Sequence, residues 1–115
     1  MNTRVIGSLK EDLAISYLEE NGFEILERNF KCKIGEIDVI AKKNNCIRFI
    51  EIKYRDSSFA GGVHYAIDNK KLLKISKIAN FYIMTHPNYN MAYSIDALLI
   101  NNEQIEYLEN IFGGM

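Results

Sequence analysis

The sequence predicts a single domain of the α/β or α+β class, in which helices flank a mixed β-sheet. Three observations support this fold class. The 115 residues are enough for one hydrophobic core. Apolar residues recur at helical spacing in two segments, and further segments have strand character. Their order along the chain is helix, three strands, helix and two strands, which is typical of a sheet with helices packed against it.

The first element is a helix over about residues 8–20. Its apolar residues recur at helical spacing: Ile6, Leu9, Leu13, Tyr17 and Leu18. Asn21-Gly22 follows where such a helix would end, because both residues favour a helix C-terminus. A first strand then begins with Phe23, Ile25 and Leu26.

Two strands joined by a tight turn come next. Residues 34–41 and 47–54 both alternate between apolar and polar positions, and Asn44-Asn45 lies between them, where Asn tolerates positive φ. With Asn44-Asn45 as a two-residue turn, Lys43 faces Cys46. Ile37 then faces Ile52, and Val39 faces Ile50, on one apolar face of the hairpin.

The other face of this hairpin carries charge. In the same register Asp38 falls opposite Glu51, and Glu36 falls opposite Lys53. Two carboxylates roughly 5 Å apart across a ladder repel each other, and a bound cation would remove that cost. Any even-length loop keeps these four residues on one face, whereas an odd-length loop separates Asp38 from Glu51. The sequence therefore predicts a divalent metal site, with a solvated outer sheet face as the alternative.

Such a site suits phosphodiester chemistry. Magnesium prefers oxygen ligands, and two carboxylates with water and a substrate phosphate supply them. Lys53 follows Glu51 by two residues, so it would stabilise the phosphate or help to activate water. Glu11 lies at the border of the first helix's apolar stripe, which makes it a third candidate ligand or a solvated helix residue.

The second half of the chain begins with a loop over residues 57–62 and a helix from about Asp68. The apolar stripe of this helix consists of Leu72, Ile75, Ile78, Ala79 and Tyr82. Pro87 follows the helix, and residues 93–100 and 105–108 are the last two strands.

Basic residues gather on this second helix. Lys70, Lys71, Lys74 and Lys77 fall mostly opposite the apolar stripe, where they either hold nucleic-acid phosphates or form a solvated face. Lys53 and Arg55, with the Gly61-Gly62 loop, would extend this basic rim toward the carboxylates. The net charge of −1 and the pI near 6.1 exclude a strongly basic field, so nucleic acid would need such a local patch.

Other features of the sequence are less informative. Cys32 and Cys46 form neither a CxxC motif nor a Cys/His cluster, which favours reduced, half-buried thiols. His64 and His86 suit surface or capping roles. No apolar stretch is long enough for a membrane span, and no signal-peptide core is recognisable, so we expect a cytoplasmic protein without a membrane partner.

Several motifs together resemble a known family. Gly35-Glu36-Ile37-Asp38-Val39-Ile40, followed by residues 49–55 (FIEIKYR), resembles the GEIDLI…FVEVKxR signature of the small bacterial YraN-type family. The segment of residues 7–14 resembles the family's G-xx-(G/K)-E-xx-A opening, and Arg28-Asn29-Phe30 resembles its rN segment. Gly61-Gly62 and Lys71 also match the pattern, so the resemblance spans nearly the whole chain.

This resemblance implies a restriction-endonuclease-like α/β fold of the PD-(D/E)XK superfamily, near the archaeal Holliday junction resolvases. It implies that Asp38 and Glu51 bind magnesium or manganese and that Lys53 is the catalytic lysine. Glu11 would match the N-terminal-helix glutamate of the resolvases, and Glu36 belongs to the signature without an assigned role. The family usually has RFD before its late strand, where this chain has Ser94-Ile95-Asp96, which weakens a phosphate contact there.

The function expected from these features is magnesium-dependent endonucleolytic cleavage of DNA, with branched or damaged DNA as substrate. The alternatives are a non-catalytic nucleic-acid-binding or partner module that retains the fold, and an oligomerisation subunit. No small-molecule cofactor is expected. A resolvase-like role would require a homodimer with two-fold symmetry; Ile111 and Phe112 in the apolar tail suggest a dimer face without defining it.

Overall fold

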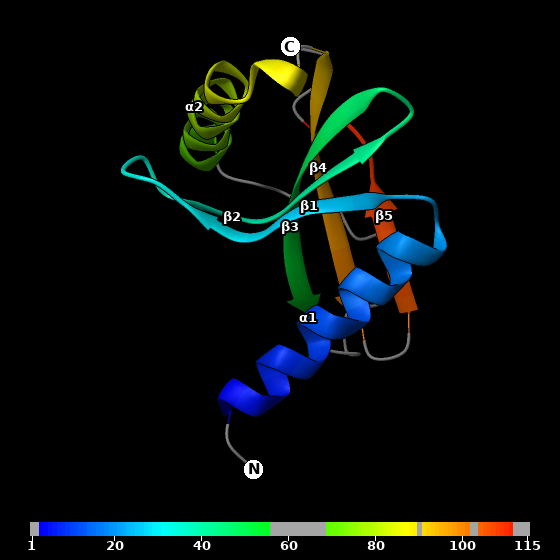
Figure 1. The fold of residues 1–115 in the computed structure, drawn as a ribbon. Helices are drawn as coiled ribbons and strands as arrows, with labels where there is room; N and C mark the ends of the chain where they lie inside the picture. Colours follow the sequence, from blue (N-terminus) through cyan, green and yellow to red (C-terminus); the bar gives the residue numbers. More distant parts are fainter. Residues whose placement is uncertain (1–2, 56–68, 90, 102–103, 112–115) are drawn as a thin grey trace.

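The computed structural model describes residues 3–55, 69–89, 91–101 and 104–111, which form an α/β fold with a five-stranded sheet (Figure 1). The helices are α1 (Thr3–Glu20), α2 (Asn69–Thr85) and the short 3-10 helix η1 (Pro87–Tyr89). The strands are β1 (Glu24–Lys31), β2 (Glu36–Lys43), β3 (Cys46–Arg55), β4 (Ala92–Asn101) and β5 (Gln104–Leu108). This architecture is compatible with a restriction-endonuclease-like fold, as predicted.

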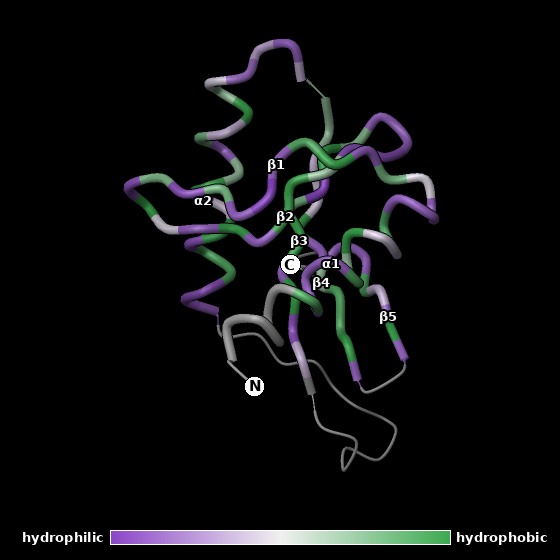
Figure 2. Tube along the Cα trace, turned by 60° about the horizontal axis from the view of Figure 1, so that its bottom comes forward, coloured by the Kyte–Doolittle hydropathy of each residue, from purple (hydrophilic) through white to green (hydrophobic). Residues whose placement is uncertain are grey.

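The sheet is mixed, and its strands follow the order β1-β2-β3-β4-β5. Neighbouring strands are antiparallel except for β3 and β4, which are parallel. The parallel pair follows from the connection through α2, because parallel neighbours need a long crossover. Strands β3 and β4 are hydrophobic along most of their length (Figure 2), as expected for strands covered on both faces.

Two cores lie on opposite faces of the sheet. The larger core packs α2 against Ile47 and Phe49 of β3, and the second packs α1 against Ile50 and Ile52 of the same strand. The α2 stripe predicted from the sequence is confirmed, since Leu72, Ile75, Ile78, Ala79 and Tyr82 are all buried.

The predicted hairpin register is confirmed from the turn to the pair Val39–Ile50, whereas the predicted pairs Ile37–Ile52 and Asp38–Glu51 lie beyond the end of the ladder. Lys43 pairs with Cys46 and Val39 with Ile50. Asn44 and Asn45 have φ values of 54° and 57°, which are the left-handed values of a two-residue turn that matches the twist of its strands. The loop between the two strands therefore has an even length, as predicted.

The predicted stripe of α1 is partly wrong. Ala14 and Leu18 are buried, but Leu9 and Leu13 are 59% and 47% exposed. The face of α1 that packs on the sheet runs instead through Glu11, Ala14, Ile15 and Leu18, so Leu9 and Leu13 lie beside it. The N-terminal turns of α1 run past the end of β3 (Figure 1).

The prediction that Ile37 shares a face with Val39 is wrong. Val39 packs in the core under α1, whereas Ile37 packs in the core under α2. Two residues that are two apart lie on the same face of a regular strand, so the alternation of β2 breaks at the residue between them, Asp38.

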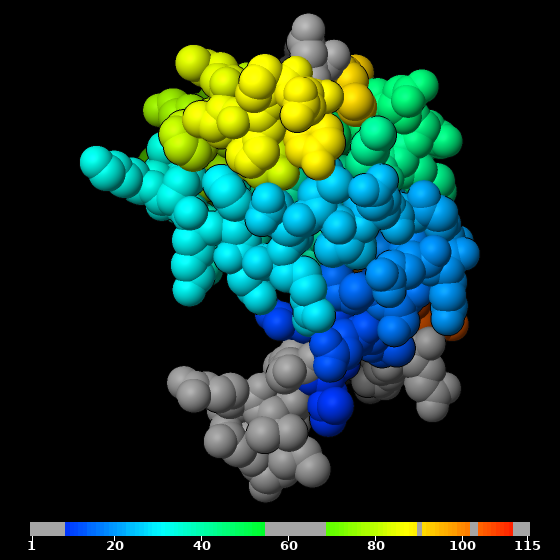
Figure 3. Space-filling view, viewed as in Figure 1, coloured from blue at the N-terminus to red at the C-terminus, as the bar shows by residue number. Residues whose placement is uncertain are grey.

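Strand β1 changes face at the same point. Arg28 pairs with Val39 and Phe30 with Ile37, and Asn29 between them has a φ of 52°. Beyond this point hairpin β1–β2 leaves the main sheet and projects beside α2 (Figure 3). The break therefore turns only the outer part of the hairpin, residues 30–37, toward the face of α2.

The minor sequence features have mixed outcomes. Cys32 and Cys46 are free and half-buried, as predicted. His86 stacks on Tyr82 at the C-terminal end of α2, and its Nδ1 lies 2.8 Å from the Tyr82 carbonyl oxygen, in agreement with a capping role. His64, Phe112, the 57–62 loop and the Arg55 side chain lie outside the described residues. Within the described part of the chain, neither helix is both long and apolar enough to cross a membrane.

Candidate functional site

The candidate site forms where β2 and β3 separate. Their ladder ends at the pair Val39–Ile50. In a continuing ladder the Ile52 amide would bond to the backbone of Ile37, but it donates instead to Asp38 Oδ2 at 2.8 Å. The Asp38 side chain therefore closes the end of the ladder, and this bond fixes its orientation.

The surroundings of Asp38 disfavour its charge. Burial raises the pKa of Asp38 to about 6, and the nearby carboxylates of Glu51 and Glu11 act in the same direction. The Ile52 amide and the Lys71 ammonium lower the pKa of Asp38, but they do not offset burial. An additional cation at this place would favour the ionised carboxylate.

Glu51 lies beside Asp38 on the α2 side of the sheet, two residues beyond the core residue Phe49. Its side chain is only 10% exposed, and Glu51 Oε1 lies 2.6 Å from Lys71 Nζ of α2. Asp38 and Glu51 line one cavity of about 490 Å³, as the register requires. The other lining residues are Gly35, Glu36, Lys70, Lys71, Lys74, Ile75 and Ile78.

Glu11 reaches Asp38 from the opposite side. It lines a small hollow between α1 and the sheet together with Asp38 and Ile52, in agreement with the predicted orientation of the first helix. Tyr54 lies two residues after Ile52 on the same face of β3. Burial, Glu11 and Asp38 together raise the pKa of Tyr54 to about 12. Asp38 thus lies between Glu11 on one face and Glu51 on the other.

The two remaining predicted residues of the hairpin are Glu36 and Lys53. Glu36 is exposed at the cavity rim and pairs across the ladder with Lys31 of β1, so its predicted pairing with Lys53 is wrong. The reason is that β2 has already left β3 at this point. Lys53 shares the face of Glu51 along β3 and makes no ion pair with another residue that the structure describes.

The α2 lysines reach the site as a group. Lys70, Lys71 and Lys74 line the cavity, whereas the exposed Lys77 does not. Lys74 packs closely against Gly35, where a Cβ would lie 3.2 Å from Lys74 Cε. Glu51 therefore has its lysine partner from α2 rather than from Lys53, a relationship that the sequence did not indicate.

These residues suit a magnesium or manganese ion. Asp38 offers carboxylate oxygens in a place where burial disfavours its charge, and Oδ1 lies beside the bonded Oδ2. Glu51 supplies a second carboxylate. Across the described residues, no group of three or more His, Cys, Asp or Glu side chains is arranged to hold a metal ion. Magnesium commonly uses one or two carboxylates and completes its shell with water and phosphate, so two ligands are sufficient.

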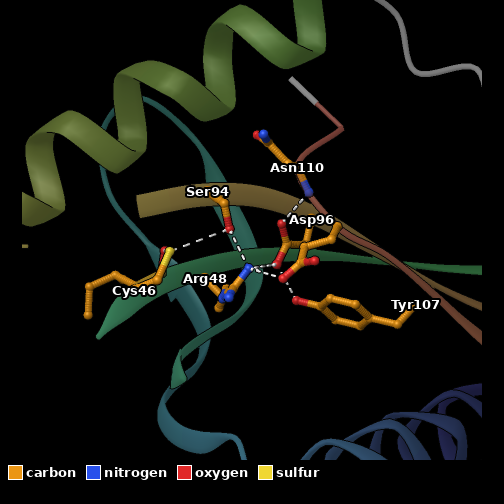
Figure 4. A network of polar contacts seen from close by, with 8 residues as sticks. Cys46, Arg48, Ser94, Asp96, Tyr107 and Asn110 are labelled. Carbon is orange, nitrogen blue, oxygen red and sulfur yellow. Dashed lines mark hydrogen bonds and ion pairs between the residues drawn. The ribbon is translucent and has the colours of Figure 1, made fainter. Parts of the chain in front are cut away.

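Sequence reasoning missed a buried polar network on β3, β4 and β5 (Figure 4). Arg48 Nη1 lies 3.2 Å from Ser94 Oγ, 3.6 Å from Asp96 Oδ2 and 2.7 Å from Glu109 Oε1. Asp96 is fully buried and also accepts hydrogen bonds from the Tyr107 hydroxyl and from the Asn110 amide. This network holds β3, β4 and the end of β5 together.

The network includes the position where this chain departs from the family pattern. Where that pattern has an arginine two residues before the aspartate, this chain has Ser94, and Arg48 from the neighbouring strand lies beside it. A recognisable signal was present, because Arg48 and Asp96 each interrupt an apolar strand and buried charges require partners.

Comparisons with known proteins identify the family of this chain. Residues 10–100 match the model of the uncharacterised protein family UPF0102. A UPF0102 protein of Helicobacter hepaticus is 46% identical over 111 residues, which cover 96% of this chain and 97% of the relative. One from Fusobacterium nucleatum is 40% identical over 114 residues, which cover 99% and 96%. The match spans the helix α1, the hairpin and α2, and the chain therefore belongs to the family UPF0102, the YraN-type family that its motifs resemble.

Proposed function

We propose that this protein is a magnesium-dependent endonuclease that hydrolyses phosphodiester bonds in DNA, with branched or damaged DNA as its substrate class. The observation that carries the proposal is the convergence of Asp38, Glu51 and the α2 lysines on one cavity. Hydrolysis of a phosphodiester with a metal ion requires adjacent acidic and basic side chains. The carboxylates bind the ion, and the lysine ammonium groups bind phosphate.

Each residue has a distinct part in this proposal. Asp38 and Glu51 supply the protein ligands for the ion, and the Ile52 amide keeps Asp38 oriented. A bound divalent ion would lower the pKa of a water molecule and neutralise charge on the phosphate. Lys53 extends from the strand face of Glu51, where its ammonium would offset charge that develops on the phosphate oxygens.

The remaining groups would position the DNA. Lys70 and Lys74 at the cavity rim would bind phosphates on either side of the cleaved bond. Glu11 approaches from the α1 side and holds negative charge near Asp38, which favours binding of a cation there. Its role is therefore electrostatic support or an additional ligand.

A cleavage assay tests the proposal. Purified protein is incubated with labelled linear, nicked, flapped and four-way DNA, in magnesium, manganese or EDTA. We expect products only with a divalent ion, and none from Asp38→Asn or Lys53→Met. Lys77→Met is the matched control, because Lys77 is exposed on α2 and lies outside the cavity lining. Cleavage in EDTA, full activity of Asp38→Asn, or no cleavage of any substrate would overturn the proposal.

One observation favours the alternative of a non-catalytic nucleic-acid-binding module. Lys71 already neutralises Glu51 at 2.6 Å, so the carboxylate has a partner without a metal ion. Such a module would bind the same DNA panel in EDTA and in magnesium with equal affinity and would cut none of it. Fluorescence anisotropy alongside the cleavage assay separates the two functions.

A further inference from the structure

The ammonium of Lys71 lies beside the Glu51 carboxylate, in the cavity that Asp38 also lines. It lies 2.6 Å from Glu51 Oε1, and its charge also acts on Asp38. Glu51 is the fixed partner of the pair, since its side chain is 10% exposed and β3 holds it. Lys71 is the adjustable partner, because its side chain is 40% exposed and its flexible stem extends from α2.

A divalent ion on the same carboxylate would conflict with this ion pair. Magnesium binds carboxylate oxygens at about 2.0–2.1 Å, which is closer than the ammonium lies. The two positive charges would also repel each other across a few ångströms in a partly buried site. An ion that binds Glu51 must therefore displace the Lys71 ammonium or bind with a penalty.

The displaced ammonium has a suitable destination. Lys71 lines the cavity together with its neighbour Lys70 and with Lys74, about one turn further along α2. Its surroundings are therefore basic. A DNA phosphate held by these neighbours would offer an acceptor within reach of the same side chain. With metal and DNA both bound, Glu51 would be paired with the metal ion and the Lys71 ammonium with a phosphate.

We propose that Lys71 is an exchangeable counter-cation that couples metal binding to DNA binding. Without DNA it neutralises Glu51 and weakens metal binding; with DNA it transfers to a phosphate and leaves Glu51 to the ion. This inference rests on the proposed function, and it adds a regulatory step to that site. Because linkage is reciprocal, metal tightens DNA binding by the same factor by which DNA tightens metal binding.

Manganese binding to the full chain tests the exchange. Free Mn²⁺ is measured by its EPR signal, on ice, with and without a four-way DNA junction, and a DNA-only titration is subtracted. We expect Lys71→Met to bind Mn²⁺ about 5-fold tighter or more than wild type without DNA, and to lose most of the tightening that DNA produces. Lys71→Arg retains the charge and should behave like wild type.

Two controls separate the exchange from general effects. Lys77→Met removes one exposed charge from the same helix outside the cavity lining and should leave Mn²⁺ affinity unchanged. Thermal melts of all variants establish that they are folded. If Mn²⁺ binds wild type and Lys71→Met equally, with the same effect of DNA, the exchange is overturned while the metal site stands. If neither binds Mn²⁺ even with DNA, the proposed metal site is overturned together with the exchange.

Discussion

The backbone amide of Ile52 donates a 2.8 Å hydrogen bond to the Asp38 carboxylate at the place where β2 and β3 separate. A side chain thus substitutes for the next bond of the ladder. One oxygen of Asp38 is committed to the fold, and burial, Glu51 and Glu11 raise the pKa of this carboxyl group to about 6. The same residue therefore links the stability of the hairpin to the chemistry of the cavity.

Stability without metal should depend on pH through Asp38. Its folded pKa of about 6 exceeds the ordinary value of 3.8, so the folded state holds the proton more tightly than the unfolded chain. Ionisation of Asp38 therefore lowers the free energy of unfolding progressively between about pH 4 and about pH 6, and the loss remains at higher pH. Asp38→Asn cannot ionise, so its stability relative to wild type should rise over this interval. Urea unfolding in EDTA at several pH values measures the difference.

The amide oxygen of Asn can still accept the Ile52 hydrogen bond, so this substitution isolates the charge. Asp12→Asn is the control, because Asp12 forms only an exposed ion pair with Arg28. A stability difference for Asp38→Asn that stays constant from low to neutral pH would contradict the prediction.

Divalent ions should stabilise the folded protein. At about 100 times the Kd, magnesium or manganese should add about 2.7 kcal/mol to the free energy of unfolding, because a ligand that binds only the folded state shifts the equilibrium by mass action. Asp38→Asn should abolish the gain while DNA binding persists or tightens. Thermal melts with and without the ion measure the effect, and the absence of any metal-dependent shift in wild type at millimolar concentrations would argue against a preformed site.

The α2 lysines should contribute to DNA affinity in a salt-dependent way. Each phosphate contact contributes about 0.9 to the slope of log K against log salt for duplex DNA. Replacing Lys70, Lys71 and Lys74 together by Gln should reduce the slope by up to about 2.7 and weaken binding. Fluorescence anisotropy over a series of salt concentrations measures both quantities.

An equal change of charge elsewhere serves as the control for this triple variant. Lys42 and Lys43 precede the turn between β2 and β3, and Lys77 lies on α2 outside the cavity lining. Replacing these three by Gln should change the slope much less. Equal losses in both triple variants would mean that DNA senses only the total charge of the protein.

The buried network should be important for stability and not for cleavage. Arg48 is 7% exposed and Asp96 is 0% exposed, so Arg48→Met leaves a buried carboxylate without its cation. Removing one partner of a buried pair costs about 3–5 kcal/mol, whereas Arg28→Met at the exposed pair with Asp12 should cost less than about 1 kcal/mol. Urea unfolding compares the two, and similar losses would show that the network contributes little.

Local patterns in the sequence predicted much of the fold. The hairpin register depended on two asparagines that tolerate positive φ and on apolar residues facing one another, and both signals lie within about 20 residues. The stripe of α2 was correct because that helix packs along its length on one core. The placement of Asp38 and Glu51 at one cavity followed from the register.

Signals that depend on tertiary geometry were missed. Assigning strand faces from alternating residues assumes a regular strand. The alternation therefore could not show that the chain changes face at Asn29 and Asp38, which places Ile37 in the core under α2. Helical spacing marked Leu9 and Leu13 as core because spacing alone does not show which side of a helix faces the sheet, and the packed side runs through Ala14, Ile15 and Leu18.

The partner of Glu51 was missed for a similar reason. The register placed Lys53 opposite Glu36 and predicted no ion-pair partner for Glu51, whose lysine is 20 positions further along the chain. Only the packing of α2 over the sheet brings Lys71 there, and no local pattern encodes that packing.

The break in the ladder at Asp38 has a consequence for how the two layers of the protein communicate. A continuous sheet isolates the helices on its two faces, because backbone hydrogen bonds close the space between them. At Asp38 this partition is interrupted, and one carboxylate adjoins Glu11 beneath α1 and Glu51 beneath α2. A shift in the packing of α1 therefore changes the electric field in the cavity on the far side, without any movement of α2 itself.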